Sequence, residues 1–309
     1  MKWRFGILLP VVLACLLGVV GSLWRALRGP LPAGGARPPM VKRMVTDMAG
    51  RQVRLPARPE RILSICTSAS DTVAALGETS RLAAIDSYSR VVPGLEQTPV
   101  VGKGGALSKE QILARKIDLA FIWWYQDEAA ALLAELDVPV VRLRAVRAAE
   151  LPGLVRLVGD CLVCPEKAAL VARRLEAFLA APPPVLPAVT PPTVYLELYG
   201  AYRTVGRDSY LNDLLELAGG RNVIRQVSGG LTVSPELMVQ ADPEVMVTVA
   251  GFTDAAQLRA RPGLAGVRAV AAGRVYAIER RWLVAGPALP EAVAMLRDVL
   301  AEPAVIPNK

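Results

Sequence analysis

Residues 108–122 read SKEQILARKIDLAFI, and residues 234–248 read SPELMVQADPEVMVT. Aligned without a gap, both stretches begin with a serine, carry a glutamate at the third position (Glu110 and Glu236) and an acid at the eleventh, and end in an apolar run. A serine before an amphipathic stretch is typical of a helix N-terminus, and a short apolar run after it is typical of a buried strand. The chain therefore contains the same helix–strand unit in each half.

Strands and helices alternate on both sides of each copy. In the first half a hairpin at 44–56 precedes strands at 61–65, 81–86, 117–123 and 139–143, with helices at 72–77, 108–115 and 127–136. In the second half we expect strands at 193–199, 244–249 and 274–278, with helices at 209–220, 234–241, 254–260 and 289–301. Such alternation with short connections predicts parallel sheets covered by helices.

A helical run separates the two halves. It extends from Ala148 to Ala180, is interrupted at CLVCP (161–165), and leads into the proline-rich connector 181–192. We therefore expect an α/β fold with two lobes, mainly parallel sheets and a ligand cleft between the lobes. The expected boundaries are 43–147 for the N-terminal lobe, 148–182 for the connecting helical segment and 183–309 for the C-terminal lobe.

The first residues are typical of an export segment. Lys2 and Arg4 precede an apolar stretch at 5–24, which is about long enough to span a bilayer core. We interpret residues 1–28 as a signal peptide or membrane anchor and 29–42 as a linker. Cleavage, retention, and lipidation at Cys15 in the sequence VLAC remain open. Each outcome places residues 41–309 in the periplasm or on the outer face of the cytoplasmic membrane.

Composition excludes several classes of protein. Hydrophobic residues make up 53% of the 309, which argues against disorder. The net charge is +8, but residues 1–40 hold five bases and no acid, so only +3 remains on the rest of the chain. A mildly basic body with no Lys/Arg stripe is a poor binder of the phosphate backbone. We expect no nucleic-acid partner.

Cysteine and histidine usage limits the possible metal and redox chemistry. The chain has four cysteines and no histidine, so a structural zinc site lacks its usual ligands. Cys161 and Cys164 stand three positions apart in CLVCP. We favour a local disulfide or a pair of small buried thiols for these two residues over a redox centre.

Residues that follow the predicted strands indicate where a ligand would bind, because open parallel sheets bind ligands at the carboxyl ends of their strands. Thr67, Ser87, Ser209 and Arg280 lie at such ends. The residues predicted to bind the ligand are Ser68, Tyr88, Trp123, Trp124, Tyr125, Tyr199, Tyr202, Arg203, Arg207, Phe252, Arg281 and Trp282. An aromatic cleft edged with arginines suits a large planar or greasy ligand that carries anionic groups.

The sequence from about residue 43 to 303 resembles the class III periplasmic substrate-binding proteins of ABC importers for iron–siderophores, haem and cobalamin. The matching phrases are DMAGRQVRLPARPERILSICTSASDTVAALG (47–77), SKEQILARKIDLAFI (108–122), TVGRDSYLNDLLELAGGRNV (204–223) and LTVSPELMVQADPEVMVTV (231–249). The resemblance implies two lobes joined by one long rigid helix. It further implies a monomer that delivers its ligand to an ABC permease dimer, with Glu110 and Glu236 docking into arginine pockets on the two permease subunits.

The resemblance also implies a metal complex as ligand, with no intrinsic cofactor. Because the chain has no histidine, any axial ligand from the protein would be Tyr88, Tyr125, Tyr199, Tyr202, a methionine or a cysteine. This favours a ligand whose metal is already saturated, such as a ferric siderophore or cobalamin, and leaves tyrosinate-ligated haem open.

Two other functions compete with import. The absence of histidine removes the Ser-His and Cys-His nucleophile pairs, and no HExxH, GxSxG or phosphate-loop motif occurs. We therefore expect no enzyme, including the metal-cofactor enzymes of similar fold. A membrane-tethered ligand sensor or scaffold with the same cleft is the alternative if the apolar segment is retained.

Overall fold

Two four-stranded sheets form the centre of the two lobes, and both are parallel throughout. The structure is a computed structural model that describes residues 43–181 and 190–302, all within one compact unit, Lys42–Lys309. The first sheet has the order β4-β3-β7-β8 and the second the order β11-β9-β13-β14. Counted along the chain, both orders are second, first, third, fourth. The expected α/β fold with parallel sheets in two lobes is confirmed, and the duplication extends to the topology of the sheets.

The first lobe begins with the predicted hairpin. Its elements are β1 (Arg43–Thr46), β2 (Gln52–Leu55), β3 (Ile62–Ser64), α2 (Thr67–Ala75), β4 (Leu82–Ile85), β5 (Gly102–Lys103), β6 (Ala106–Leu107), α3 (Lys109–Ala114), β7 (Leu119–Trp123), α4 (Asp127–Glu135) and β8 (Val140–Leu143). Gly50, at φ +76°, makes the turn of the hairpin. The short β5–β6 hairpin is the element that the sequence did not predict.

The second lobe repeats this plan. Its elements are β9 (Thr193–Glu197), β10 (Arg203–Thr204), α7 (Tyr210–Leu217), β11 (Arg221–Asn222), β12 (Leu231–Thr232), α8 (Pro235–Ala241), β13 (Val245–Val249), α9 (Ala255–Arg259), α10 (Arg268–Ala271), β14 (Val275–Ile278) and α11 (Leu289–Ala301). β10 and β12 form a separate antiparallel pair. The two-residue strands and α10 are too short to give a periodic signal in the sequence.

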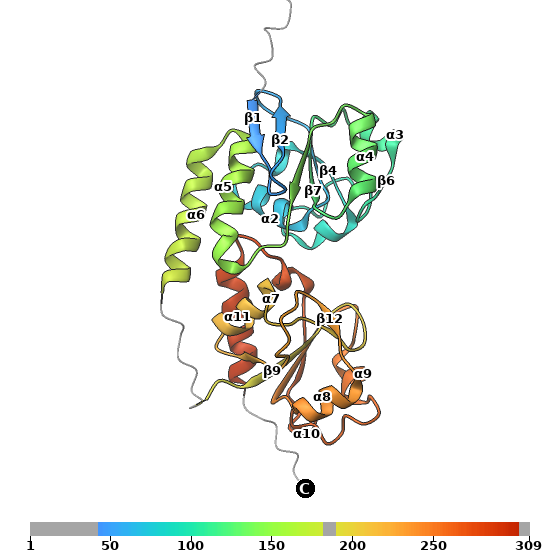
Figure 1. Ribbon diagram of the computed structural model, residues 1–309, viewed down its shortest axis with the longest axis vertical. Coiled ribbons are helices and arrows are strands. Elements are labelled where there is room, and N and C mark those ends of the chain that lie inside the picture. Colours follow the sequence, from blue (N-terminus) through green and yellow to red (C-terminus); the bar gives the residue numbers. More distant parts are fainter. Residues whose placement is uncertain (1–42, 182–189, 303–309) are drawn as a thin grey trace, which may run out of the picture. The chain divides into compact units, whose positions relative to one another are not determined.

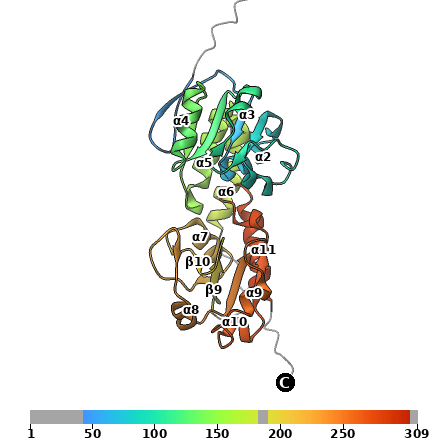
Figure 2. The same cartoon turned by 90° about the vertical axis from the view of Figure 1, so that its right-hand side faces the viewer.

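The alternation of side chains along each strand builds two layers of core. In β7, Leu119 and Phe121 belong to a shared core that also contains residues of α2, α5, α6, α7, α11 and the second sheet. Ile122 faces the outer core of the first lobe, beneath α3 and α4. In β13, Val247 lies in the shared core and Met246 in the outer core beneath α8, α9 and α10. Each sheet is therefore covered on both faces, as Figures 1 and 2 show for β9 between α8 and α11.

The connecting segment consists of two helices, α5 (Leu151–Leu162) and α6 (Pro165–Ala180), which pack side by side (Figure 1). Val163, in the left-handed region, ends α5, and Pro165 begins α6, so the interruption falls at CLVCP as predicted. The single long helix implied by the resemblance is here a pair. Gly159 permits the close crossing, because a Cβ there would lie 2.2 Å from the Cβ of Ala168.

Arginine side chains hold this helical pair to the lobes. Arg43 Nη1 donates to the carbonyl of Asp160 at 2.9 Å, and Arg81 Nη1 donates to the carbonyl of Leu162 at 2.7 Å, so both satisfy carbonyls at the C-terminus of α5. At the other end, the Ala148 amide, at the start of the helical segment, donates to Asp213 Oδ2 of α7 at 2.8 Å, as does Nε of the neighbouring Arg147. These contacts connect the helical segment to the first lobe and to the second.

The repeated unit is built alike in both lobes. Ser108 and Ser234 cap α3 and α8, as predicted. The acid at the eleventh position has a structural role that the sequence did not reveal. Asp118 accepts hydrogen bonds from the backbone of Glu60 and Arg61 just before β3, and Glu244 accepts one from the backbone of Thr193 at the start of β9. In both lobes this carboxylate fixes the neighbouring strand next to the third strand of the sheet.

The cysteine pair is a pair of buried thiols. Cys161 and Cys164 are free, as is Cys66, so the structure contains the second of the two forms expected and not the disulfide. Burial raises the pKa of Cys66 and Cys161 to about 12, and burial also raises the pKa of Cys164. A thiol that stays protonated is a poor nucleophile. All three cysteines belong to the shared core.

The predicted export segment, with Cys15, lies outside the described residues. Among residues 43–181 and 190–302, no helix is both long enough and apolar enough to cross a membrane.

Candidate functional site

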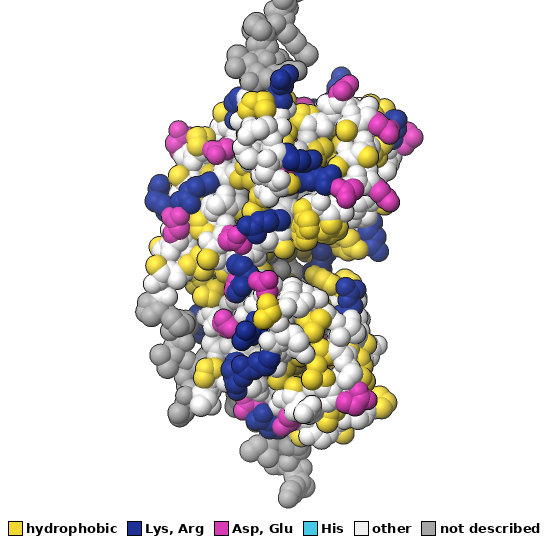
Figure 3. Space-filling model, viewed as in Figure 1, with side chains coloured by type: hydrophobic (Ala, Val, Ile, Leu, Met, Phe, Trp, Pro, Cys, Tyr) yellow, Lys and Arg dark blue, Asp and Glu magenta, His cyan; other side chains and the backbone are white. Residues whose placement is uncertain are grey.

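A cavity of about 540 Å³ lies at the carboxyl ends of the strands of both lobes. The first lobe lines it from beyond β3, β4, β7 and β8, and the second from beyond β9, β13 and β14. The volume falls within the range of roughly 300–1,000 Å³ typical of ligand pockets. The position agrees with the prediction that strand ends form the site. Figure 3 shows the surface hollowed at mid-height, with hydrophobic side chains along the edges.

The structure brings nine of the strand-end residues together around this cavity. These are Thr67, Ser68, Tyr88, Trp123, Tyr125, Tyr199, Arg203, Phe252 and Arg280. Seven of them belong to the predicted ligand-binding set, and their aromatic rings come from both lobes. Whether they bind a ligand remains a prediction.

Trp124 and Tyr202 were predicted to line the site and do not. Trp124 lies beyond the end of β7, where its ring packs edge-on against Tyr125 with centroids 4.8 Å apart. Tyr202 packs instead against the outer core of the second lobe, where the guanidinium of Arg261 lies 4.6 Å from its ring. Its left-handed backbone is fixed by Glu197, which accepts a 2.9 Å hydrogen bond from the Tyr202 amide.

Arg207, Arg281 and Trp282 also lie outside the cavity. Arg207 has an exposed side chain, and its amide is bonded to the carbonyl of Gln226 at 2.9 Å. Arg281 stacks on Trp282 at 4.1 Å, and both line a separate cavity of about 190 Å³. The 3₁₀ turn Arg280–Leu283 directs successive side chains to different sides. This explains why Arg280 lines the main cavity while Arg281 and Trp282 do not.

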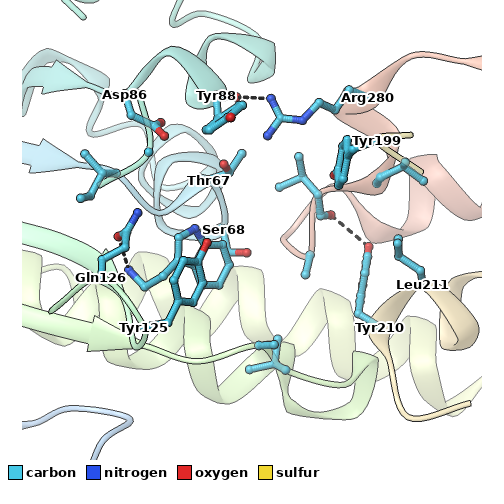
Figure 4. A pocket seen from close by; sticks show the side chains of 18 of the residues that line it. Thr67, Ser68, Asp86, Tyr88, Tyr125, Gln126, Tyr199, Tyr210, Leu211 and Arg280 are labelled. Atoms are coloured by element: carbon cyan, nitrogen blue, oxygen red, sulfur yellow. Dashed lines mark hydrogen bonds between the residues drawn. The ribbon is translucent and has the colours of Figure 1, made fainter. Parts of the chain in front are cut away.

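Arg280 joins the two lobes across the cavity (Figure 4). Its Nη1 donates to the main-chain carbonyl of Tyr88 at 3.1 Å. Its guanidinium lies 4.6 Å from the centroid of the Tyr88 ring and 5.8 Å from that of Tyr199. A planar cation held against two aromatic rings at a cavity is positioned to meet an anionic group of a ligand.

Exposed aromatic rings line the cavity from both lobes. Tyr199 and Phe252 pack edge-on with centroids 4.9 Å apart in the second lobe, and they remain 42% and 45% exposed. In the first lobe Tyr125 is 61% exposed. Rings left this exposed at a cavity offer apolar faces to a ligand and not to the protein core.

Polar groups that the sequence did not single out complete the lining. Asp86 follows β4 and is almost fully buried. Burial raises the pKa of its carboxyl, while hydrogen bonds from Ser89 and the charge of Arg280 act in the opposite direction. Gln126 Oε1 accepts a 2.8 Å hydrogen bond from the Trp123 amide, which fixes the turn after β7. Asp86 and Gln126 are adjacent in sequence to predicted strand-end residues, so including one more residue on each side of those positions would have found them.

Tyr210 also lines the cavity and was not predicted. It begins α7, is buried, and donates its hydroxyl to the carbonyl of Val284 at 3.0 Å (Figure 4). Burial raises the pKa of this phenol far above its ordinary value. Because it is a helix residue and does not follow a strand, the strand-end rule missed it.

The two predicted docking glutamates lie on α3 and α8 and do not line the cavity. Hydrogen bonding lowers the pKa of Glu110 and of Glu236, first from each residue's own amide and then from the serine that caps the helix. Both carboxylates are therefore ionised at neutral pH. Docking itself remains a prediction.

The lining of the cavity combines aromatic, hydroxyl and charged side chains. Within residues 43–181 and 190–302, no three His, Cys, Asp or Glu side chains gather to hold a metal ion. Acidic and basic side chains are interspersed on the face shown in Figure 3. The cavity offers aromatic faces, hydroxyls and arginines, which suit a planar ligand with anionic substituents.

Comparisons with known proteins agree with this geometry. A sequence model described as periplasmic binding protein matches residues 62–281, which is more than half of the chain. A cobalamin-binding protein of Halobacterium salinarum is 26% identical over 215 residues, which cover 65% of this chain and 57% of that protein. The match thus spans little more than half the length of that relative.

Two further relatives match over most of their length. YvrC of Bacillus subtilis, an uncharacterized ABC transporter substrate-binding lipoprotein, is 20% identical over 268 residues, which cover 82% of this chain and 84% of YvrC. The crystal structure of a periplasmic heme binding protein from Pseudomonas aeruginosa has a TM-score of 0.68 and 28% identity, and the match covers 79% of this chain and 95% of that one.

Proposed function

This chain belongs to the periplasmic binding protein family, and on that premise we propose that it captures a metal-bearing macrocycle, haem or cobalamin, outside the cytoplasm and delivers it to an ABC permease. The observation that carries the proposal is the cavity whose aromatic rings come from both lobes and which Arg280 crosses. Relatives named for binding cobalamin and heme support the ligand class. A member of a binding-protein family is expected to bind its ligand without turnover.

The shape and charge of the lining suit such a macrocycle. Tyr125 on one lobe and the Tyr199–Phe252 pair on the other offer aromatic faces to a flat ring system. Arg280 and Arg203 supply positive charge for the acidic or amide side arms that surround haem and corrin rings. A ferric siderophore, the third ligand class expected from the sequence, shares the need for positive charge but not the need for a flat apolar face.

Ligation from the protein distinguishes the two macrocycles. The chain has no histidine, and the hydroxyl of Tyr210 is already bonded to Val284. Tyr88, Tyr125 and Tyr199 are the other phenols at the cavity. A haem would take one of them as an axial ligand, whereas cobalamin would need none.

A tryptophan fluorescence titration tests ligand capture, because Trp123 lines the cavity. Haemin, cyanocobalamin and ferrichrome serve as the three probes. We expect saturable quenching with haemin or cyanocobalamin, and a loss of affinity of at least about tenfold in the double variant Tyr199→Ala/Phe252→Ala. Val227→Ala, an exposed residue outside the cavity, is the matched control. Flat traces with all three probes at micromolar concentration would rule out the proposed ligands.

Delivery to the permease is tested separately. The double variant Glu110→Ala/Glu236→Ala should bind ligand as the wild type does, because both residues lie outside the cavity. We expect it to lose stimulation of uptake into membrane vesicles of the source organism that have been stripped of their own binding protein. Uptake at the wild-type rate would contradict the docking role.

A further inference from the structure

The helices that carry the two glutamates also expose one aliphatic side chain each. Leu113 on α3 is 56% exposed, and Val239 on α8 is 44% exposed. Each stands three positions after its glutamate, Glu110 or Glu236. Under the alignment that relates the two halves, Leu113 and Val239 occupy the same position.

The two helices are seated in the same rotation on their lobes. Ile112 of α3 is buried in the outer core of the first lobe, and Met238 of α8 is buried in the outer core of the second. These two anchors also correspond under the alignment. Because the next residue on a helix points about 100° away from such an anchor, Leu113 and Val239 are directed outward for the same geometric reason.

Each helix therefore presents an acid and an aliphatic group side by side. Residues three apart lie on one face of a helix, about one turn from each other. Ser108 Oγ donates to Glu110 Oε2 at 3.0 Å, which holds the first carboxylate near the helix N-terminus. We name the set Glu110, Leu113, Glu236 and Val239 the paired docking surface.

Packing within the chain does not require these aliphatic groups. The outer cores are closed by Ile112 and Met238, and replacing a half-exposed leucine or valine by a polar residue costs the fold little. One exposed aliphatic residue on a surface needs no explanation. Two at corresponding positions, each beside a corresponding ionised carboxylate, indicate a requirement that acts on both lobes alike.

We infer that Leu113 and Val239 contact the two subunits of the ABC permease, one on each subunit. Each side chain inserts into an apolar pocket next to the basic group that binds Glu110 or Glu236. This inference rests on the proposed function and adds to it. The partner must offer two equivalent sites, because the paired docking surface presents the same combination of an acid and an aliphatic side chain on each lobe. Each site must combine a cationic group with an apolar depression, which complements a carboxylate and an aliphatic side chain one turn apart.

The test uses the full chain and the same stripped vesicles, with haemin or cyanocobalamin as the transported probe. The double variant Leu113→Gln/Val239→Gln should bind either probe with unchanged affinity. The concentration of binding protein that gives half-maximal uptake should rise about tenfold, and each single variant should give a similar part of that rise. Leu170→Gln, on α6 and 48% exposed, is the matched control and should not change it.

The outcomes separate this inference from the function it rests on. If Glu110→Ala/Glu236→Ala abolishes uptake while Leu113→Gln/Val239→Gln leaves half-saturation unchanged, docking stands and the aliphatic contact is wrong. The inference would also be overturned if only one of the two single variants raised the half-saturating concentration, since it assumes that the two lobes make equivalent contacts. Wild-type protein that stimulates no uptake would remove the proposed function, and this inference with it.

Discussion

Arg280 of the second lobe donates a 3.1 Å hydrogen bond to the main-chain carbonyl of Tyr88 in the first lobe, and its guanidinium lies 4.6 Å from the ring of the same tyrosine. The side chain of Arg280 thus contacts both the backbone and the ring of Tyr88 in the opposite lobe. Since the carbonyl belongs to the backbone, no substitution of Tyr88 removes that half of the contact. The contact between Arg280 and Tyr88 therefore joins the two lobes through the same arginine that we expect to bind an anionic group of the ligand.

Replacing Arg280 by alanine should weaken binding of haemin or cyanocobalamin by about tenfold to a hundredfold, because it removes a charge-assisted contact and the link between the lobes. Arg280→Lys keeps the charge but loses the planar stack on Tyr88, so it should recover only part of the affinity. Fluorescence titration of the three proteins measures this. Equal affinity in wild type and Arg280→Ala would show that the arginine serves the lobes alone.

Asp71 predicts a pH dependence of stability. It is buried on α2, its Oδ2 accepts a 3.5 Å hydrogen bond from the Ala288 amide, and Gly286 leaves room for it, since a Cβ there would lie 2.2 Å from Oδ2. Burial raises its pKa to about 6, the Ala288 amide acts in the opposite direction, and Glu291 adds to the rise. The folded protein therefore holds this proton more tightly than the unfolded chain.

The stability that Asp71 contributes should be complete below about pH 4 and lost as the pH rises through 6. Asp71→Asn removes this dependence. The difference in free energy of unfolding, Asp71→Asn minus wild type, should therefore be about 2–3 kcal/mol more favourable to the variant at pH 8 than at pH 4. Urea unfolding at both pH values gives the comparison, with the exposed Asp298→Asn as control. Identical pH profiles for wild type and Asp71→Asn would refute it.

Substituting the cavity tyrosines should identify an axial ligand if haemin binds. One of Tyr88→Phe, Tyr125→Phe and Tyr199→Phe should shift the visible spectrum of the haemin complex, because phenylalanine has no ligating oxygen. Tyr210→Phe should leave the spectrum unchanged, since that hydroxyl is bonded to Val284. A spectrum altered by Tyr210→Phe would contradict the choice of these three tyrosines, and a spectrum altered by none of the four variants would contradict tyrosinate ligation.

The ion pair between Glu197 and Arg261 should dominate the stability of the second lobe. Glu197 is fully buried, and Arg261 donates to both of its oxygens at 2.6 and 2.7 Å. Arg261→Met leaves a buried carboxylate unpaired, which should cost about 3–5 kcal/mol in urea unfolding. The double variant Glu197→Gln/Arg261→Met buries no charge and should regain much of this. Additive losses would mean that the carboxylate is not the source of the cost.

The periodic parts of the fold were predictable from the sequence. The apolar runs Leu119–Trp123 and Val245–Val249, each after a serine-capped helix, were expected to be buried strands, and the structure shows them as β7 and β13, each third along the chain in its sheet. These features depend on residues close together in the chain, where hydrophobic periodicity is informative. The strand-end rule then located the cavity correctly.

What the sequence missed depends on contacts between distant residues or on the local turn. Tyr202 was assigned to the cavity. In the structure Arg261, far along the chain, pairs with Glu197 and stacks on the ring of Tyr202. Trp123 lines the cavity and Trp124 does not, because successive side chains at a strand end point to opposite sides. Neither outcome is encoded in spacing alone.

Retention of a coloured ligand tests the central claim most directly. The protein is mixed with haemin or with cyanocobalamin, passed through gel filtration, and its absorption spectrum is recorded beside that of Ser68→Trp, which places a large ring in the cavity. We predict that one macrocycle elutes with the wild-type protein at about one per chain and that Ser68→Trp elutes largely colourless. Colourless wild-type protein with both ligands, or equal colour in wild type and Ser68→Trp, would contradict capture in the cleft between the lobes.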